Sequence, residues 1–221
     1  MKRFIALILI CAASTPFKLH AQVVTPEAPD MTPGNPNNVT LELVYAGISK
    51  ALNEKTVTQG YLAYGYDDDL ALAIGDLGRV VNKSVQVGAR YLFFASDGNS
   101  DQHSFWAYLN AEKYLNDQWR IDTRQVMEYR LDTSGVDERT RYRPRFRISY
   151  LDSFGQQNYQ IYASVEPIWN LTDNGDDQVS WATGGFLQLS EHAQLNVFYQ
   201  FTEAERGPDF HFPGVGVLFS F

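Results

Sequence analysis

The sequence predicts an all-β chain that closes into an antiparallel transmembrane β-barrel of the bacterial outer membrane. Three observations predict this fold: an N-terminal export signal, long segments in which polar and apolar residues alternate, and an aromatic last residue, Phe221. After the first fifteen residues, no apolar run approaches the ~18 residues that a membrane-spanning helix needs. We therefore interpret the alternating segments as strands.

Residues 1–21 are typical of a secretory signal peptide. Two basic residues precede the apolar stretch 4–13, and cleavage is expected after Ala21. At 1.5 Å per residue, about ten apolar residues cover only about half of a ~30 Å hydrocarbon core, so a membrane anchor is disfavoured. The single cysteine, Cys11, lies in this stretch. The exported chain is therefore expected to lack disulfides.

Residues 22–39 are rich in Pro, Asn and Thr, and we expect a flexible leader because such a segment buries too little apolar surface to offset the entropy of ordering. Residues 40–53 fit either a short amphipathic helix or an extra strand. The rest of the chain gives ten predicted strands, and outer-membrane barrels usually have an even number. An eleventh strand is therefore disfavoured, and the helix, placed in the periplasm or in the lumen, is preferred. The barrel domain is expected over residues 54–221.

Ten strands follow from the period-two alternation, which is sharpest where four arginines alternate with other residues over 141–148. A twelve-strand barrel, with another strand within 74–84, is the alternative. The connections alternate between tight turns and longer polar loops, as in outer-membrane barrels with short periplasmic turns. The strands are expected at 56–66, 69–79, 84–95, 103–114, 117–131, 139–151, 158–170, 177–189, 193–203 and 211–221.

Alternation also fits a soluble sheet, so other features must favour the barrel. Many aromatic residues lie near the predicted strand ends, where outer-membrane barrels carry interfacial girdles. The last strand ends in an alternating signature typical of the signal read by the barrel-assembly machinery, made of Val215, Val217, Phe219 and Phe221. Three prolines, Pro144, Pro167 and Pro213, argue against a regular ladder and are expected at bulges or outside the membrane.

Two neighbouring predicted strands carry a charged face that we expect to point into the lumen. Guanidinium groups bind carboxylates in a bidentate fashion, and rows of arginine favour anions in pores, so this face predicts a track for small anionic solutes. The alternative is a structural ladder in which carboxylates neutralise the arginines and hold a narrow lumen shut. The face comprises Arg120, Asp122, Arg124, Glu128, Arg130, Arg141, Arg143, Arg145, Arg147 and, on the next strand, Glu166.

The spacing of Arg124, Glu128-Tyr129-Arg130 and Arg141-Tyr142-Arg143-Pro144-Arg145-Phe146-Arg147, with Tyr150 and the terminal Phe221, resembles a bacterial family of small exported outer-membrane β-barrels of unknown function. The resemblance covers about residues 56–221. It implies an outer-membrane location and brings no known activity. A more remote likeness, through the arginine pattern and the barrel ending, is to the narrow oligogalacturonate and sialic-acid porins, whose lumens carry arginine tracks for acidic sugars.

Other chemistry has little support in the sequence. Neither a cofactor motif nor a metal-ligand spacing is recognisable, and the mature chain has three histidines, His103, His192 and His211, so we expect no enzyme. A lipid- or peptide-hydrolysing barrel and a non-catalytic adhesion or structural barrel are the alternatives to a channel. The formal net charge of -8 argues against nucleic acid as a partner. The expected partners are outer-membrane lipids, the assembly machinery and small anionic solutes.

Overall fold

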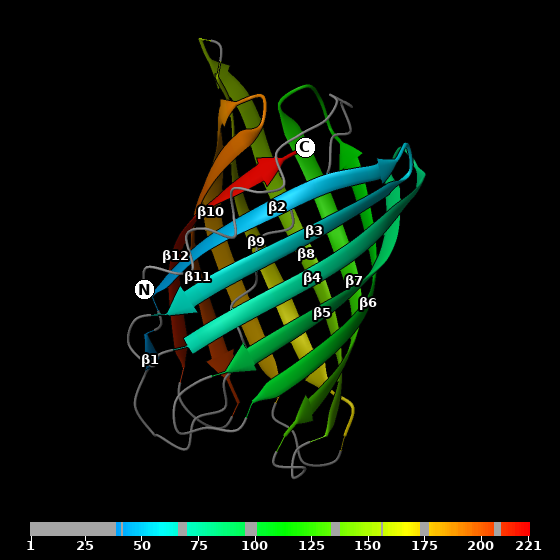
Figure 1. Ribbon diagram of the computed structural model, residues 1–221, viewed down its shortest axis with the longest axis vertical. Coiled ribbons are helices and arrows are strands. Elements are labelled where there is room, and N and C mark those ends of the chain that lie inside the picture. The colour runs from blue at the N-terminus through cyan, green and yellow to red at the C-terminus, as the bar shows by residue number, and fades with distance from the viewer. Residues whose placement is uncertain are drawn as a thin grey trace.

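Eleven long strands wind into one closed barrel in the computed structural model, which describes residues 39–40, 42–65, 70–95, 101–133, 138–155, 157–172, 177–205 and 209–221 (Figure 1). The two-residue β1 adds a short pairing. The predicted signal peptide and all but the end of the leader lie outside the described residues. The strands are β1 Val39–Thr40, β2 Leu43–Asn53, β3 Thr56–Gly65, β4 Leu70–Asn82, β5 Val85–Ala95, β6 Gln102–Tyr114, β7 Trp119–Asp132, β8 Arg139–Phe154, β9 Gln157–Asn170, β10 Gln178–Ser190, β11 Ala193–Ala204 and β12 Phe210–Ser220.

Each strand from β2 to β12 pairs antiparallel with its neighbour in sequence, and the barrel closes where β12 pairs parallel with β2. The parallel register runs from Gly214 opposite Leu43 to Ser220 opposite Ser49. An odd number of successive antiparallel strands leaves the first and last pointing the same way, so eleven strands can close only through a parallel pair. The backbone N–H of Phe221 extends this seam by donating to the carbonyl of Ser49 over 3.0 Å.

The expected count of ten strands is wrong. Of the two alternatives for residues 40–53, the favoured helix is wrong and the extra strand is correct, because residues 43–53 form strand β2. The twelve-strand alternative is also wrong, since β4 runs without a break from Leu70 to Asn82. Parity misled the prediction because it assumed closure through antiparallel pairs alone. Without β2, the edges of β3 and β12 would present unpaired backbone groups, which cost several kcal/mol each in hydrocarbon. Among the described residues, no helix is long and apolar enough to cross a membrane.

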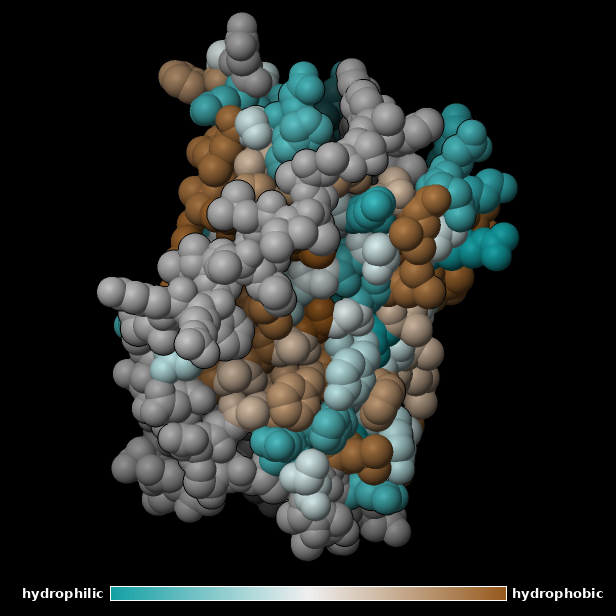
Figure 2. All heavy atoms as spheres, viewed as in Figure 1, coloured by the Kyte–Doolittle hydropathy of each residue, from teal (hydrophilic) through white to brown (hydrophobic). Residues whose placement is uncertain are grey.

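The outer wall is apolar between two rows of aromatic residues. Trp119 packs edge-to-face on Tyr150 near the tight turns, with ring centroids 5.2 Å apart, and Tyr142 stacks on Trp169 toward the longer connections, at 5.6 Å. On β7, Trp119 and Tyr129 both point outward and are ten residues apart, about 33 Å along the strand or about 25 Å along the axis of a barrel tilted by ~40°. Figure 2 shows apolar residues over much of the visible described wall, with hydrophilic residues toward its ends.

Two prolines interrupt the ladder between β8 and β9. The register pairs Tyr142 with Trp169 and Phe146 with Val165, with no pairing in between, which places Pro144 opposite Pro167. Neither proline has an N–H group, so one hydrogen-bonded position of the ladder is lost. These prolines were expected at bulges or beyond the membrane. They lie instead inside the apolar wall, and the register is the same on both sides of them, so they form no bulge. The third, Pro213, keeps its register opposite Tyr199.

Candidate functional site

The charged face predicted from the sequence lines the inside of the barrel on β7, β8 and β9. Alternation turns every second residue inward, and the β7–β8 register sets Glu128 opposite Arg141, Arg124 opposite Arg145 and Asp122 opposite Arg147. All ten residues of the predicted face are buried. Their side chains form three carboxylate-centred clusters along the inner wall, which we call the arginine ladder.

Glu128 is the centre of the first cluster. Its Oε2 accepts from Arg141 Nη2 over 2.8 Å and from Arg143 Nη1 over 2.9 Å, and its Oε1 lies 3.3 Å from Arg130 Nη2. The hydroxyl of Ser104 on β6 also donates to Oε1. Three guanidinium groups and a hydroxyl therefore surround one carboxylate, which satisfies its lone pairs away from water.

Glu166 on β9 is the centre of the second cluster. Arg124 Nη2 donates to its Oε2 over 2.9 Å, and Arg143 Nε donates to its Oε1 over 2.7 Å. Arg143 also reaches Glu128, so it joins the first two clusters. Like charges that face each other across a ladder are destabilising, and Glu166 offsets this repulsion where Arg124 lies opposite Arg145.

Asp122 holds the third cluster, nearest to the tight turns. Its Oδ2 accepts from Arg147 Nε over 2.8 Å, and its Oδ1 lies 3.4 Å from Arg145 Nη2. Arg120 Nε is 4.0 Å from the same carboxylate, and Arg120 Nη1 is 3.5 Å from Glu112 Oε2. The network thus becomes looser toward this end of the barrel.

Trp106 on β6 joins the arginine ladder to Arg90 on the adjoining strand β5, and sequence reasoning did not single it out as a site residue. The guanidinium carbons of Arg143, Arg90 and Arg124 lie 4.6, 5.1 and 5.3 Å from its ring centroid, within cation–π range. Its indole N–H donates to Ser104 Oγ over 2.9 Å. The only signal in the sequence was its inward position two residues after Ser104 on an alternating strand.

Arg90 and Asp76 form a further buried ion pair on β5 and β4, which sequence reasoning also missed. Arg90 Nε donates to Asp76 Oδ2 over 2.8 Å, and the Tyr108 hydroxyl donates to Oδ1 over 2.8 Å. Each of these strands carries a single charged residue on its inner face, so no repeated pattern announced the pair. The register Asp76 opposite Arg90 brings them together.

Aromatic and aliphatic side chains share the rest of the inner wall with uncharged polar ones such as Gln59 and Asn196, and several rings lie flat on glycines of the adjoining strand. Tyr45 covers Gly216, and Tyr108 covers Gly88; in both positions a Cβ on the glycine would collide with the ring. Both are direct cross-strand partners. The same arrangement recurs for Gly47 with Tyr61, Gly184 with Tyr162 and Gly214 with Phe198. The interior therefore has a basic side on β7–β9 and an aromatic side around it.

Comparison with known families matches residues 44–209 to the family described as "Protein of unknown function (DUF2490)". The chain belongs to this family. The match confirms the expected membership of a family of unknown function. No curated protein matches this DUF2490 chain.

Three solved structures are similar to this DUF2490 protein, each with 12% sequence identity. The first is a bacterial polysaccharide outer membrane secretin, with a TM-score of 0.50, covering 72% of this chain; the chain spans 62% of the secretin. The second is the KdgM porin, with a TM-score of 0.50 over 79% of this chain and 89% of the porin. The third is the KdgM porin in complex with disordered oligogalacturonate, with a TM-score of 0.51 over 79% and 90%. At this identity the likeness shows a porin-like barrel fold.

The described histidines of the DUF2490 barrel make contacts on its outer wall and at its rim. The Tyr91 and Tyr199 hydroxyls lie within hydrogen-bond reach of His103 Nδ1 and His211 Nδ1, respectively, and His192 Nδ1 is 3.1 Å from the carbonyl of Ser220. His103 and Ser104 are adjacent on β6, so they point to opposite faces and cannot act as a base and nucleophile pair. Within the described ranges, no three potential metal ligands gather at one point.

Proposed function

We propose that this DUF2490 protein is an outer-membrane barrel that passes small anionic solutes along the arginine ladder. The apolar outer wall of about 25 Å between aromatic rows supports the membrane placement, because it matches the band of transmembrane barrels. The tight turns and the C-terminus lie at one end of the barrel, which we assign to the periplasm (Figure 1). The porin-like fold is compatible with this role.

The charge balance of the interior is the observation that carries the proposal. Among the described residues, eight arginines are buried inside against four carboxylates, although the whole chain has a formal charge of -8. A purely structural ladder needs no such excess, because each buried guanidinium costs desolvation that a matched carboxylate offsets best. An excess of inward positive charge attracts anions and repels cations.

The ion pairs also provide a route for exchange. Arg124 and Arg143 both hold Glu166, and a solute carboxylate offers the same pair of acceptor oxygens. A solute carboxylate can therefore replace Glu166 on one of these two guanidinium groups while the other keeps its ion pair with Glu166. Both arginines then remain paired with a carboxylate. Acidic oligosaccharides are suitable first probes, since the KdgM porin was solved with oligogalacturonate.

Single-channel recording in planar bilayers tests this proposal. Purified protein should give a small anion-selective conductance that oligogalacturonate blocks and neutral maltooligosaccharides do not. The Arg145→Gln variant should lower the anion-to-cation permeability ratio, while Lys113→Gln, at an exposed lysine near the tight turns, should leave it unchanged. A cation-selective or unselective current would refute the anion track.

A closed structural barrel is the second candidate, and the burial of the ladder favours it. Arg124 and Arg141 are each 1% exposed, so water does not reach them in this arrangement and passage requires side chains to move. The same recordings test this candidate. Protein whose insertion into the bilayer is verified by protection from external protease would then give no current with any salt. That result would establish the closed barrel and reject the channel.

A further inference from the structure

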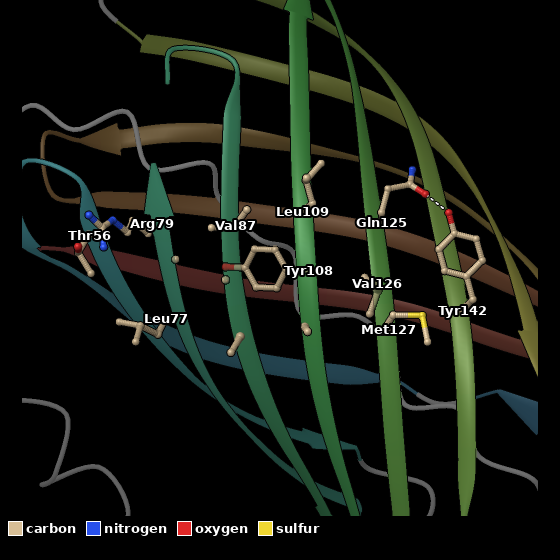
Figure 3. A pocket seen from close by; sticks show the side chains of 14 residues that line it. Thr56, Leu77, Arg79, Val87, Tyr108, Leu109, Gln125, Val126, Met127 and Tyr142 are labelled. Atoms are coloured by element: carbon tan, nitrogen blue, oxygen red, sulfur yellow. Dashed lines mark hydrogen bonds between the residues drawn. The ribbon is translucent and has the colours of Figure 1, made fainter. Parts of the chain in front are cut away.

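A groove of about 750 Å³ crosses the outer wall from β3 to β8, on the side opposite to the lumen lining (Figure 3). Outward residues such as Leu77 and Met127, which are 50% and 45% exposed, border it. Its floor is low because Ala89 and Ala107 are cross-strand partners at its centre, whereas the outward groove residues beside them, Leu77, Leu109 and Met127, are larger. The groove is therefore a mainly apolar depression of the outer wall that is open to the surroundings of the barrel.

One end of the groove carries an unpaired positive charge. Arg79 is exposed and lies beside its cross-strand partner Thr56, and both line the groove. Within the part of the chain that the structure describes, Arg79 makes no salt bridge. A guanidinium at the edge of an apolar wall is favourably placed for a phosphate, which it binds through its fork of N–H groups.

The other end of the groove is uncharged and lies further across the wall, toward the longer connections. Arg79 is three residues from Asn82, the end of β4 at the tight turns, whereas Tyr142 is twelve residues from Phe154, the corresponding end of β8. The Tyr142 hydroxyl donates to Gln125 (Figure 3). The side-chain amide of Gln125 in turn donates to Thr123 over 2.7 Å. These polar groups satisfy one another, so this end offers no free charge. The groove thus runs from a cationic edge near the tight turns across the apolar outer wall.

We propose that this groove binds one phospholipid of the surrounding membrane, with its phosphate on Arg79 and Thr56 and one acyl chain over Ala89 and Ala107. The direction of the groove fits this ligand, since a phospholipid also runs from a charged head into hydrocarbon. The proposal rests on the membrane placement given above. It does not depend on conduction, because the groove lies outside the barrel.

Native mass spectrometry of the detergent-purified barrel with added phosphatidylglycerol tests this site. Wild-type protein should retain one lipid. Arg79→Gln should lower lipid affinity about tenfold, the order expected for losing one charge-assisted phosphate contact. Ala107→Phe should abolish retention by filling the groove floor. Two matched controls should retain the lipid: Lys50→Gln, another exposed outward cation, and Ala163→Phe, another exposed outward alanine.

Two comparisons separate the lipid from simpler ligands. Diacylglycerol, which lacks the phosphate, should bind more weakly than phosphatidylglycerol and equally to wild type and Arg79→Gln. Inorganic phosphate in excess should not displace the lipid. Equal retention by all variants, or no retention by the wild type, would overturn the lipid site. If the lipid is retained but no single-channel current is seen, the channel is rejected and the lipid site is supported. If current is seen but the variants do not differ in lipid retention, the lipid site is rejected and the channel is supported.

Discussion

Arg124 and Arg145 lie directly opposite each other across β7 and β8, and both are buried inside the barrel. Two facing guanidinium groups repel, so carboxylates must hold them. Glu166 binds Arg124 from β9, and Asp122 reaches Arg145 from two positions along β7. The wall around this pair therefore depends on a few acidic side chains, and removing one has a predictable cost.

Glu166→Gln should destabilise the barrel strongly. The variant leaves the guanidinium groups of Arg124 and Arg143 without the carboxylate that they share, and breaking a buried ion pair by removing one partner costs about 3–5 kcal/mol. Urea unfolding in detergent, followed by the heat-modifiable gel shift, measures the change. Glu203→Gln, on the exposed face of β11, is the control and should change stability by less than about 0.5 kcal/mol. Equal midpoints for the two variants would contradict the clusters described.

Gly88→Ala should lower stability, because a Cβ there would collide with the ring of Tyr108 and with the backbone of Leu77. Overpacking of this kind costs about 1–3 kcal/mol. Gly75→Ala is the matched control, since a Cβ at Gly75 meets nothing within 4 Å. It should be neutral or slightly stabilising. The same unfolding experiment compares them, and a neutral Gly88→Ala would show that the ring does not lie against the wall.

Trp106→Phe should cost about 0.5–2 kcal/mol, because it weakens cation–π contacts with three arginines and removes the indole N–H that donates to Ser104. Trp181→Phe, at a tryptophan that is 51% exposed on the outer wall, should have little effect. Thermal denaturation followed by far-ultraviolet circular dichroism gives both values. A larger loss of stability in Trp181→Phe than in Trp106→Phe would contradict the stabilising role of the inward Trp106.

The parallel closure between β2 and β12 can be trapped covalently. Val44 and Val215 are paired and both point outward, so Val44→Cys with Val215→Cys should form a disulfide in the folded barrel. Val44→Cys with Val197→Cys is the control, because Val197 lies one strand further away. Non-reducing electrophoresis distinguishes them. Efficient bridging in the control and none in the test pair would mean that residues 43–53 do not close the barrel.

Asp152, at the projecting end of the β8–β9 hairpin, should titrate below the usual range. Hydrogen bonds from the Tyr150 hydroxyl and from the Ser153 backbone N–H stabilise its charged form and lower its pKa. Because the folded pKa is depressed, any stability from this carboxylate is present above its unfolded pKa and is lost as the pH falls through the folded value. Carbon-detected NMR titration should show the pKa rise in Tyr150→Phe, and rise less in Tyr159→Phe, whose contact is longer at 3.4 Å. No rise in Tyr150→Phe would be incompatible with this hairpin geometry.

The charged face was predictable from the sequence residue by residue. A strand alternates its faces with a period of two, so the runs around Arg124 and Arg145 fixed which side chains share a wall without any knowledge of the tertiary structure. The strand bounds were close for the same reason; for example, the strand expected at 193–203 is found as Ala193–Ala204. The family resemblance rested on the same local pattern.

The secondary structure of residues 43–53 was not predictable from the local sequence, because the apolar residues of this segment fit one face of a helix as well as a strand. Pairing with β3 and β12 decided it, and both partners are supplied by other parts of the chain. Asp76, Arg90 and Trp106 escaped notice for a similar reason, since Asp76 and Arg90 are the single inward charges of their strands and all three meet only through the register of β4, β5 and β6.

By itself, the amino-acid sequence determined that the chain forms strands, which side chains share each face, and that arginines crowd one side, because these properties follow from the geometry of an extended backbone. Only the tertiary structure decided that eleven strands close through a parallel seam, which carboxylate holds which arginine, and that the outer wall is hollowed beside Arg79. These features depend on register and closure, which bring together residues that are distant in the chain.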